Sequence, residues 1–144
     1  MKFQIANNDL YLSNQISNTP VQINISDRGV YFDAHKRNMT ATMFKNIVNK
    51  LGKIKIEGVN LKDNRLKDNT TTAKIIRKFF NQNLVNAHTI DLSYNQLGSK
   101  VAIVLIEVLP NCKNIEFLFL ENNKFSLEDK ECIRKALPHV RIDF

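Results

Sequence analysis

"AHTIDLSYNQL", residues 87–97, carries a pattern found in two other stretches: "IEGVNLKDNRL", residues 56–66, and "IEFLFLENNKF", residues 115–125. Each reads apolar-x-x-apolar-x-apolar-x-x-Asn-x-apolar, and the asparagines are Asn64, Asn95 and Asn123. They stand 31 and 28 residues apart, a period typical of stacked repeats. The alternation predicts a short strand, and a buried Asn can bond backbone groups where the chain leaves it. Since one such unit cannot bury its own apolar face, we predict that the repeats stack.

Helix-forming segments separate the predicted strands. Thr40 is a good N-cap for a helix that ends near Gly52. Further helices are expected after residues 70–72, after Ser99 and after Ser126, where Asp129 makes an approximate capping box. The sequence thus predicts strands that alternate with helices.

The two ends of the chain depart from the repeat pattern. We expect a single domain, residues 1–144, in which residues 1–29 form a β cap with hairpin turns at residues 7–9 and 27–29. Residues 30–137 form about four repeats, and the first is degenerate: Phe32 lies 29 residues before Leu61, and His35 takes the Asn slot. Residues 138–144 form a closing strand. The cap is expected to cover the open end of the first repeat with alternating apolar residues: Phe3, Ile5, Leu10, Leu12, Val21 and Ile23.

The third copy, "LPNCKNIEFLFLENNKF" at residues 109–125, resembles the ribonuclease-inhibitor type of leucine-rich repeat, and Cys112 matches its step into the strand. The resemblance covers about residues 30–144. It implies an α/β fold, a short leucine-rich repeat solenoid with a curved parallel sheet on its concave side and helices on its convex side. In size and in its Asn- and Lys-rich composition the chain also resembles leucine-rich repeat effectors that intracellular bacteria inject into host cells. That second resemblance implies binding to a host protein in the host cytoplasm.

The composition argues against several classes of protein. No run of 18 apolar residues is present, so we expect no membrane span, and the first residues do not read as a secretory signal. Two cysteines without metal-ligand spacing favour a reduced, cytoplasmic setting. Four glycines form no phosphate-binding loop, and three scattered histidines accompany no nucleophile motif. We therefore expect no enzyme, no cofactor and no metal.

The residues between the apolar motif positions should point onto the concave face, in ladders that cross the strands. The expected central ladder is Tyr31, Asn60, Asp91, Phe119 and, if the last strand is in register, Arg141. A second is Asp33, Lys62, Ser93, Glu121 and Asp143; a third is Asp63, Tyr94 and Asn122; a fourth is Thr89 and Phe117.

These ladders predict a surface for a protein partner. Large aromatics on a rigid sheet are typical interface anchors, and Tyr94, Phe117 and Phe119 are the candidates, with Tyr31 beside them. The polar residues Asn60, Lys62, Asp91 and Glu121 would add selectivity. The alternative is that the cap or a loop covers the aromatics.

The net charge of +7 is unevenly spread, since residues 1–80 hold 14 Lys and Arg against 6 Asp and Glu. A solvated surface is one interpretation; an acidic partner surface, an anionic membrane or nucleic acid is the other. The alternative function is therefore RNA or ribosome association through Lys62, Arg65, Lys67, Lys74, Arg77 and Lys78. A ribonuclease target is disfavoured, because ribonucleases of that class are basic and a basic chain would repel them.

Overall fold

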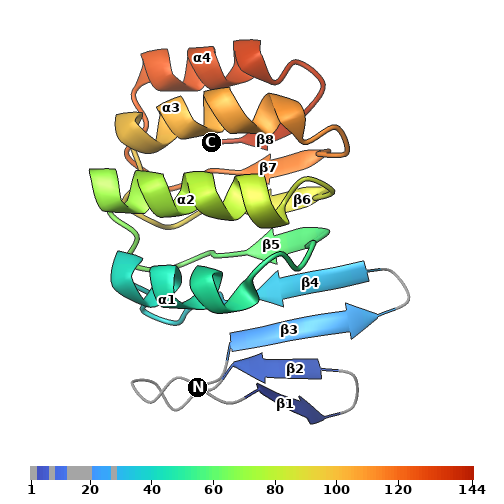
Figure 1. The fold of residues 1–144 in the computed structure, drawn as a ribbon. Coiled ribbons are helices and arrows are strands. Elements are labelled where there is room, and N and C mark those ends of the chain that lie inside the picture. Colours follow the sequence, from blue (N-terminus) through green and yellow to red (C-terminus); the bar gives the residue numbers. More distant parts are fainter. Residues whose placement is uncertain (1–2, 7–8, 13–20, 27–28) are drawn as a thin grey trace.

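The computed structural model describes residues 3–6, 9–12, 21–26 and 29–144, and its strands form one sheet in sequence order (Figure 1). Neighbouring strands are antiparallel from the first to the fourth and parallel from the fourth to the last. The strands are β1 (Phe3–Ala6), β2 (Asp9–Leu12), β3 (Val21–Ser26), β4 (Gly29–Asp33), β5 (Gly58–Asn60), β6 (Thr89–Asp91), β7 (Phe117–Phe119) and β8 (Arg141–Asp143).

Helices alternate with the parallel strands, and all of them lie on one face of the sheet (Figure 1). They are α1 (Ala41–Leu51), α2 (Thr70–Asn83), α3 (Ser99–Val108) and α4 (Leu127–Ala136), with a 3₁₀ turn, η1 (Leu109–Asn111), after α3. We call the opposite face of the sheet the open face. The predicted fold class is confirmed: the architecture is that of a short leucine-rich repeat solenoid.

The core lies between the sheet and the helices. The apolar motif residues of the three repeats are buried, and the first two repeats add a cluster of phenylalanines. The Phe79 ring meets Phe32 and Phe44 edge to face, at centroid distances of 5.8 and 5.2 Å. Such pairs add to the burial energy of each ring and tie α1 and α2 to β4.

The three motif asparagines join each repeat to the one before it. Asn95 Oδ1 accepts a hydrogen bond from the Leu66 N–H at 3.2 Å, and its Nδ2 donates to the Leu61 carbonyl at 3.0 Å. Asn64 accepts from the Met39 N–H, and Asn123 accepts from the Leu97 N–H. The predicted role of these asparagines, bonding orphaned backbone at the strand exits, is what the structure shows.

The N-cap residues of α1 and α4 are those predicted from the sequence, whereas those of α2 and α3 are different. Thr40 caps α1 through the Met43 N–H, and the Ser126 capping box of α4 is complete. In α2 the cap is Asn69 and not the threonines that follow it, because its side chain accepts from the Thr72 N–H at 2.8 Å. In α3 the cap residue, Gly98, has no side chain, so Asp68 of the preceding repeat accepts from the first N–H groups of the helix instead.

The register corrects the ladders at both ends of the sheet. Phe32 pairs with Val59, 27 residues on, so the Asn slot of the first repeat holds Arg37 and not His35. Consequently Tyr31 lies beside Gly58 and not beside Asn60. At the other end Arg141 lies beside Phe117 and not beside Phe119. Both errors arise because loop and helix lengths change the period at the first and last repeats.

The N-terminal strands β1–β3 form an antiparallel meander that extends the sheet from β4. The predicted hairpins are consistent with the pairing of Ala6 with Asp9 and of Ser26 with Gly29. The turn residues 7–8 and 27–28 lie outside the described residues, as do the side chains of the six apolar residues predicted for the cap: Phe3, Ile5, Leu10, Leu12, Val21 and Ile23.

Candidate functional site

The open face carries two rows of outward-facing residues across the parallel strands. The first row is Tyr31, Gly58, Thr89, Phe117 and Arg141, and the second is Asp33, Asn60, Asp91, Phe119 and Asp143. Between the rows, the strand residues Phe32, Val59, Ile90 and Leu118 are buried. Strand alternation therefore directs the outward residues to the open face, as predicted. The two rows differ from the predicted ladders in the residues of the first and last parallel strands.

The predicted aromatic anchors gather on β7. Phe117 is 36% exposed, and its ring is stacked on that of half-buried Phe119, with centroids 6.4 Å apart and planes 5° apart. Because the two residues alternate with buried Leu118, both rings stand on the open face. Neither the N-terminal strands nor a described loop buries Phe117, so a partner can reach it.

A hollow of about 450 Å³ opens beside this pair on the open face. Tyr31 and Phe119 lie on its two sides, Gly58 and Thr89 form part of its floor, and Asp33 and Asp91 line it. Gly58 is essential to this shape, since a Cβ there would stand 2.6 Å from Cδ1 of Tyr31. The glycine lets the tyrosine ring lie across β5.

Local hydrogen bonds hold both carboxylates of the hollow in place. Asp91 Oδ1 accepts from the Ser93 hydroxyl at 2.6 Å and from the Ser93 N–H at 2.9 Å. Asp33 Oδ1 accepts from the His35 N–H and lies 2.7 Å from His35 Nδ1. Side chains fixed in this way lose little rotamer entropy when a ligand binds.

Tyr94 lies at the edge of the open face, just past β6. It is 46% exposed, and the Lys62 ammonium lies 5.0 Å from the centre of its ring. Its backbone is left-handed, with φ of 55°, as is that of Lys36, Asp63 and Asn122 at the equivalent point of the other repeats. A tyrosine is costly in this conformation, whereas Asn and Asp tolerate it.

Ser93 of the second predicted ladder points inward and not onto the open face. Ser93 was expected to point outward between Lys62 and Glu121, but it is fully buried and bonds Asp91. The strand ends at Asp91, and the chain then turns. Alternation along a strand therefore does not predict the direction of the Ser93 side chain. Lys62 and Glu121, in the same turn of the neighbouring repeats, are half-buried.

Among the described residues, no group of three or more His, Cys, Asp or Glu is placed to hold a metal ion. None of the described helices has the length and apolarity required to cross a membrane. The two cysteines are free; Cys112 is buried, and burial raises the pKa of its thiol. A raised pKa opposes the thiolate form that nucleophilic chemistry requires.

The basic residues of the alternative RNA site do not form one surface. Lys62 contacts Tyr94 near the open face, and Arg77 pairs with Glu107 of α3. Arg65 and Lys67 are exposed in the segment between β5 and α2. Lys74 and Lys78 line a groove between α1 and α2, on the helical side of the sheet (Figure 1). The described structure therefore places Lys62 near the open face, and Lys74 and Lys78 on the helical side.

Comparison with known proteins finds likeness to solved structures. No family model matches the sequence, and no curated protein matches it. A solved leucine-rich repeat protein from Leptospira interrogans is similar, with 24% sequence identity and a TM-score of 0.43. The match covers 67% of this chain and 27% of that one, so the chain spans about a quarter of the length of its neighbour.

Five residues that line the hollow were not among the predicted site residues. Two of them, Phe32 and Val59, are buried core residues, and the other three are Asp33, Thr89 and Gly58. Asp33 was placed in a ladder with Lys62, and register alone moves it beside Asn60. Thr89 was placed in the fourth ladder, with Phe117, but given no role in binding. The pattern of outward side chains could not identify Gly58, because this residue contributes only the space that the Tyr31 ring occupies.

Proposed function

We propose that this chain is a non-enzymatic protein-binding module that holds one partner protein on its open face. The observation that carries the proposal is the hollow between Tyr31 and Phe119, next to the stacked Phe117 and lined by Asp33 and Asp91. Rigid aromatics around a hollow are typical of interface hot spots. Tyr94, Lys62, Asn60 and Glu121 surround this centre and would contact the rim of the partner.

The hollow suits a basic side chain of the partner. A Lys or Arg inserted there would meet two carboxylates, with aromatic rings on both sides for cation–π contact. The charges around it agree with this assignment. Among the described outward positions of β4–β8 and the turns that follow them, acidic residues outnumber basic ones five to three: Asp33, Asp63, Asp91, Glu121 and Asp143 against Lys36, Lys62 and Arg141. The binding face is thus acidic although the chain is basic, and we propose a basic segment as the partner's contact.

The repeat type and the setting complete the proposal. The Leu-Pro-Asn-Cys step at residues 109–112 supports the ribonuclease-inhibitor type, with η1 turning the chain into the next strand. The size and Asn- and Lys-rich composition support a bacterial effector that binds a host protein in the host cytoplasm. RNA association is the weaker alternative, because the basic residues that it needs lie on both faces.

Selection from a displayed random-peptide library tests the proposal. The wild type should enrich peptides with a Lys or Arg next to apolar residues, because the hollow pairs carboxylates with aromatic rings. The double variant Asp33→Asn/Asp91→Asn should lose this preference, and Phe119→Ala should lose the peptides altogether. Glu128→Gln/Glu131→Gln on α4 is the matched control. It also removes two negative charges, but from exposed helical positions that are far in sequence from Asp33 and Asp91.

Two results would contradict the proposal. Enriched peptides without basic residues would show that the hollow does not select a cation. Enrichment that survives both open-face variants would place the binding surface elsewhere. A capture experiment from eukaryotic lysate, run with and without nuclease, then separates the RNA alternative, because only RNA-bridged capture disappears after nuclease treatment.

A further inference from the structure

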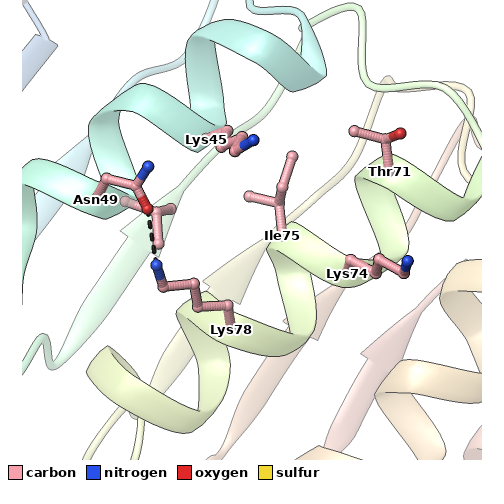
Figure 2. Close-up of a pocket in the computed structure, with 7 residues that line it drawn as sticks. Lys45, Asn49, Thr71, Lys74, Ile75 and Lys78 are labelled. Atoms are coloured by element: carbon pink, nitrogen blue, oxygen red, sulfur yellow. Dashed lines mark hydrogen bonds between the residues drawn. The ribbon is translucent and has the colours of Figure 1, made fainter.

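A second concave surface lies on the other side of the sheet, between α1 and α2. It is a groove of about 320 Å³ whose lining residues are Lys45, Val48, Asn49, Thr71, Lys74, Ile75 and Lys78 (Figure 2). Val48 and Ile75 are buried and give it an apolar floor, while the three lysines are exposed around it.

The repeat period brings the lysines together. Lys45 and Lys74 are 29 residues apart, as are Asn49 and Lys78, so each pair occupies equivalent places on adjacent helices. Lys78 Nζ donates to Asn49 Oδ1 at 2.7 Å across the groove (Figure 2). An ammonium group has three donors, so this bond orients Lys78 and leaves donors for a ligand.

No carboxylate balances this charge within the two helices. α1 and α2 contain five basic residues, Lys45, Lys50, Lys74, Arg77 and Lys78, and no Asp or Glu. α3 and α4, in contrast, mix both signs. Arg77 is paired with Glu107 on the α3 side, so lysines alone supply the charge of the groove lining. A one-sign pocket with low-dielectric walls concentrates counter-ions.

The lining of the groove has the chemistry of an anion site. Lysine binds phosphate as a point charge, and the lining holds three lysines and no Asp or Glu. No aromatic residue lines the groove, so stacking with nucleic-acid bases has no platform there. The apolar floor would contact the carbon skeleton of a ligand whose phosphates reach the lysines.

We propose that the groove between α1 and α2 binds a compact organic phosphate that carries two or more phosphate groups, free or as a lipid headgroup. Lys45 would contact it from α1, and Lys74 and Lys78 would contact it from α2. The site is separate from the protein-binding face, because the sheet lies between the two surfaces (Figure 1).

Calorimetric titration with inositol trisphosphate tests the proposal on the full chain. The wild type should bind, and Lys45→Gln/Lys74→Gln/Lys78→Gln should bind at least about tenfold more weakly, because three charged donors are lost. The control Lys113→Gln/Lys124→Gln/Lys135→Gln lowers the net charge equally at exposed positions and should stay within about twofold of the wild type. All six positions are exposed, so both variants should keep the wild-type melting temperature.

Vesicle sedimentation separates the two sources of the phosphate. The protein is sedimented with phosphatidylcholine vesicles that contain or lack phosphatidylinositol bisphosphate. If the affinity for the lipid-containing vesicles exceeds the affinity for the soluble headgroup, the ligand is membrane-bound. If the two affinities are equal, the ligand is a free phosphate compound. Phe119→Ala should leave both measurements unchanged, which distinguishes this site from the open face. The proposal is overturned if the wild type does not bind, if the control loses as much affinity, or if a polyglutamate peptide or single-stranded RNA competes more strongly than inositol trisphosphate.

Discussion

The side-chain nitrogen of Asn95 lies 3.0 Å from the carbonyl oxygen of Leu61, in the preceding repeat, and 3.1 Å from that of Leu92, in its own repeat. The same side chain accepts from Leu66. One amide therefore satisfies backbone groups of two adjacent repeats, and it links the segment after β5 to the segment after β6.

Asn95→Ala should lower the free energy of unfolding by on the order of 1–3 kcal/mol, because it leaves buried carbonyl and N–H groups without partners. Chemical denaturation measures the loss. Asn46→Ala, the same replacement at an exposed helical position, should change stability by less than about 0.5 kcal/mol. Equal effects of the two changes would show that the Asn95 bonds contribute nothing.

Phe119→Ala should cost about 1 kcal/mol of stability, because the ring is half-buried and stacked on Phe117. Alternation alone predicts a smaller effect, since an outward residue usually contributes little. Binding to a selected peptide should weaken by at least about 2 kcal/mol. A variant as stable as the wild type and equally able to bind would exclude Phe119 as an anchor.

Tyr94→Asn should leave the free energy of unfolding within about 0.5 kcal/mol of the wild type. Asn relieves the cost of a left-handed backbone at this position, and this gain offsets the lost cation–π contact with Lys62. Partner affinity should nevertheless fall, which thermal melting and peptide titration together would reveal. A clear loss of stability would indicate that Tyr94 serves folding instead of binding.

Asp129 should make α4 sensitive to acid. Burial raises the pKa of its carboxyl, but hydrogen bonds from the Ser126 N–H, the Ser99 hydroxyl and the Ser126 hydroxyl outweigh it and lower the pKa below its ordinary value. A carboxyl with a lowered folded-state pKa contributes stability above its unfolded pKa of about 3.9, and this contribution is lost as the pH falls through the folded pKa.

Asp129→Asn should therefore flatten the decline of the melting temperature below about pH 4, and should cost about 1 kcal/mol at neutral pH through the weakened cap. Glu128→Gln removes a charge from the same turn but keeps these bonds, so it should retain the decline. Identical acid profiles for the two variants would rule out the Asp129 contribution.

Deletion of residues 1–26 should cause the chain to self-associate. It removes β1–β3 and leaves β4 without its antiparallel neighbour, and an unpaired strand edge invites pairing with another chain. Gel filtration measures the outcome. A deletion variant that stays monomeric and unfolds cooperatively would contradict the proposed capping role of these strands.

Most of the fold could be predicted because its determinants are local. The motif residues of β5–β7 are buried as predicted, since apolar spacing and alternation act within one repeat. Apart from the bonds of the motif asparagines, side-chain contacts that depend on loops were not predicted. Asp68 caps α3 from 32 and 33 residues away, and Ser93 turns inward to bond Asp91 after its strand has ended.

The sequence predicted which face the strand residues of the candidate site occupy, but not which of them are neighbours across the strands. Tyr31, Asp91, Phe117 and Phe119 do stand on the open face, since strand alternation assigns faces without knowledge of neighbours. Which residues meet across strands depends on register, and a period of 27 residues between Phe32 and Val59 instead of the expected 29 regroups them.

Three side-chain contacts on the helical side each join one repeat to its immediate neighbour. Lys78 reaches Asn49, Arg77 reaches Glu107, and Ser99 reaches Asp129. Stability in such an array is a sum over adjacent interfaces. Under a stretching force applied to its two ends, the solenoid should therefore yield one interface after another, beginning at the weakest, and its force–extension curve should show separate steps.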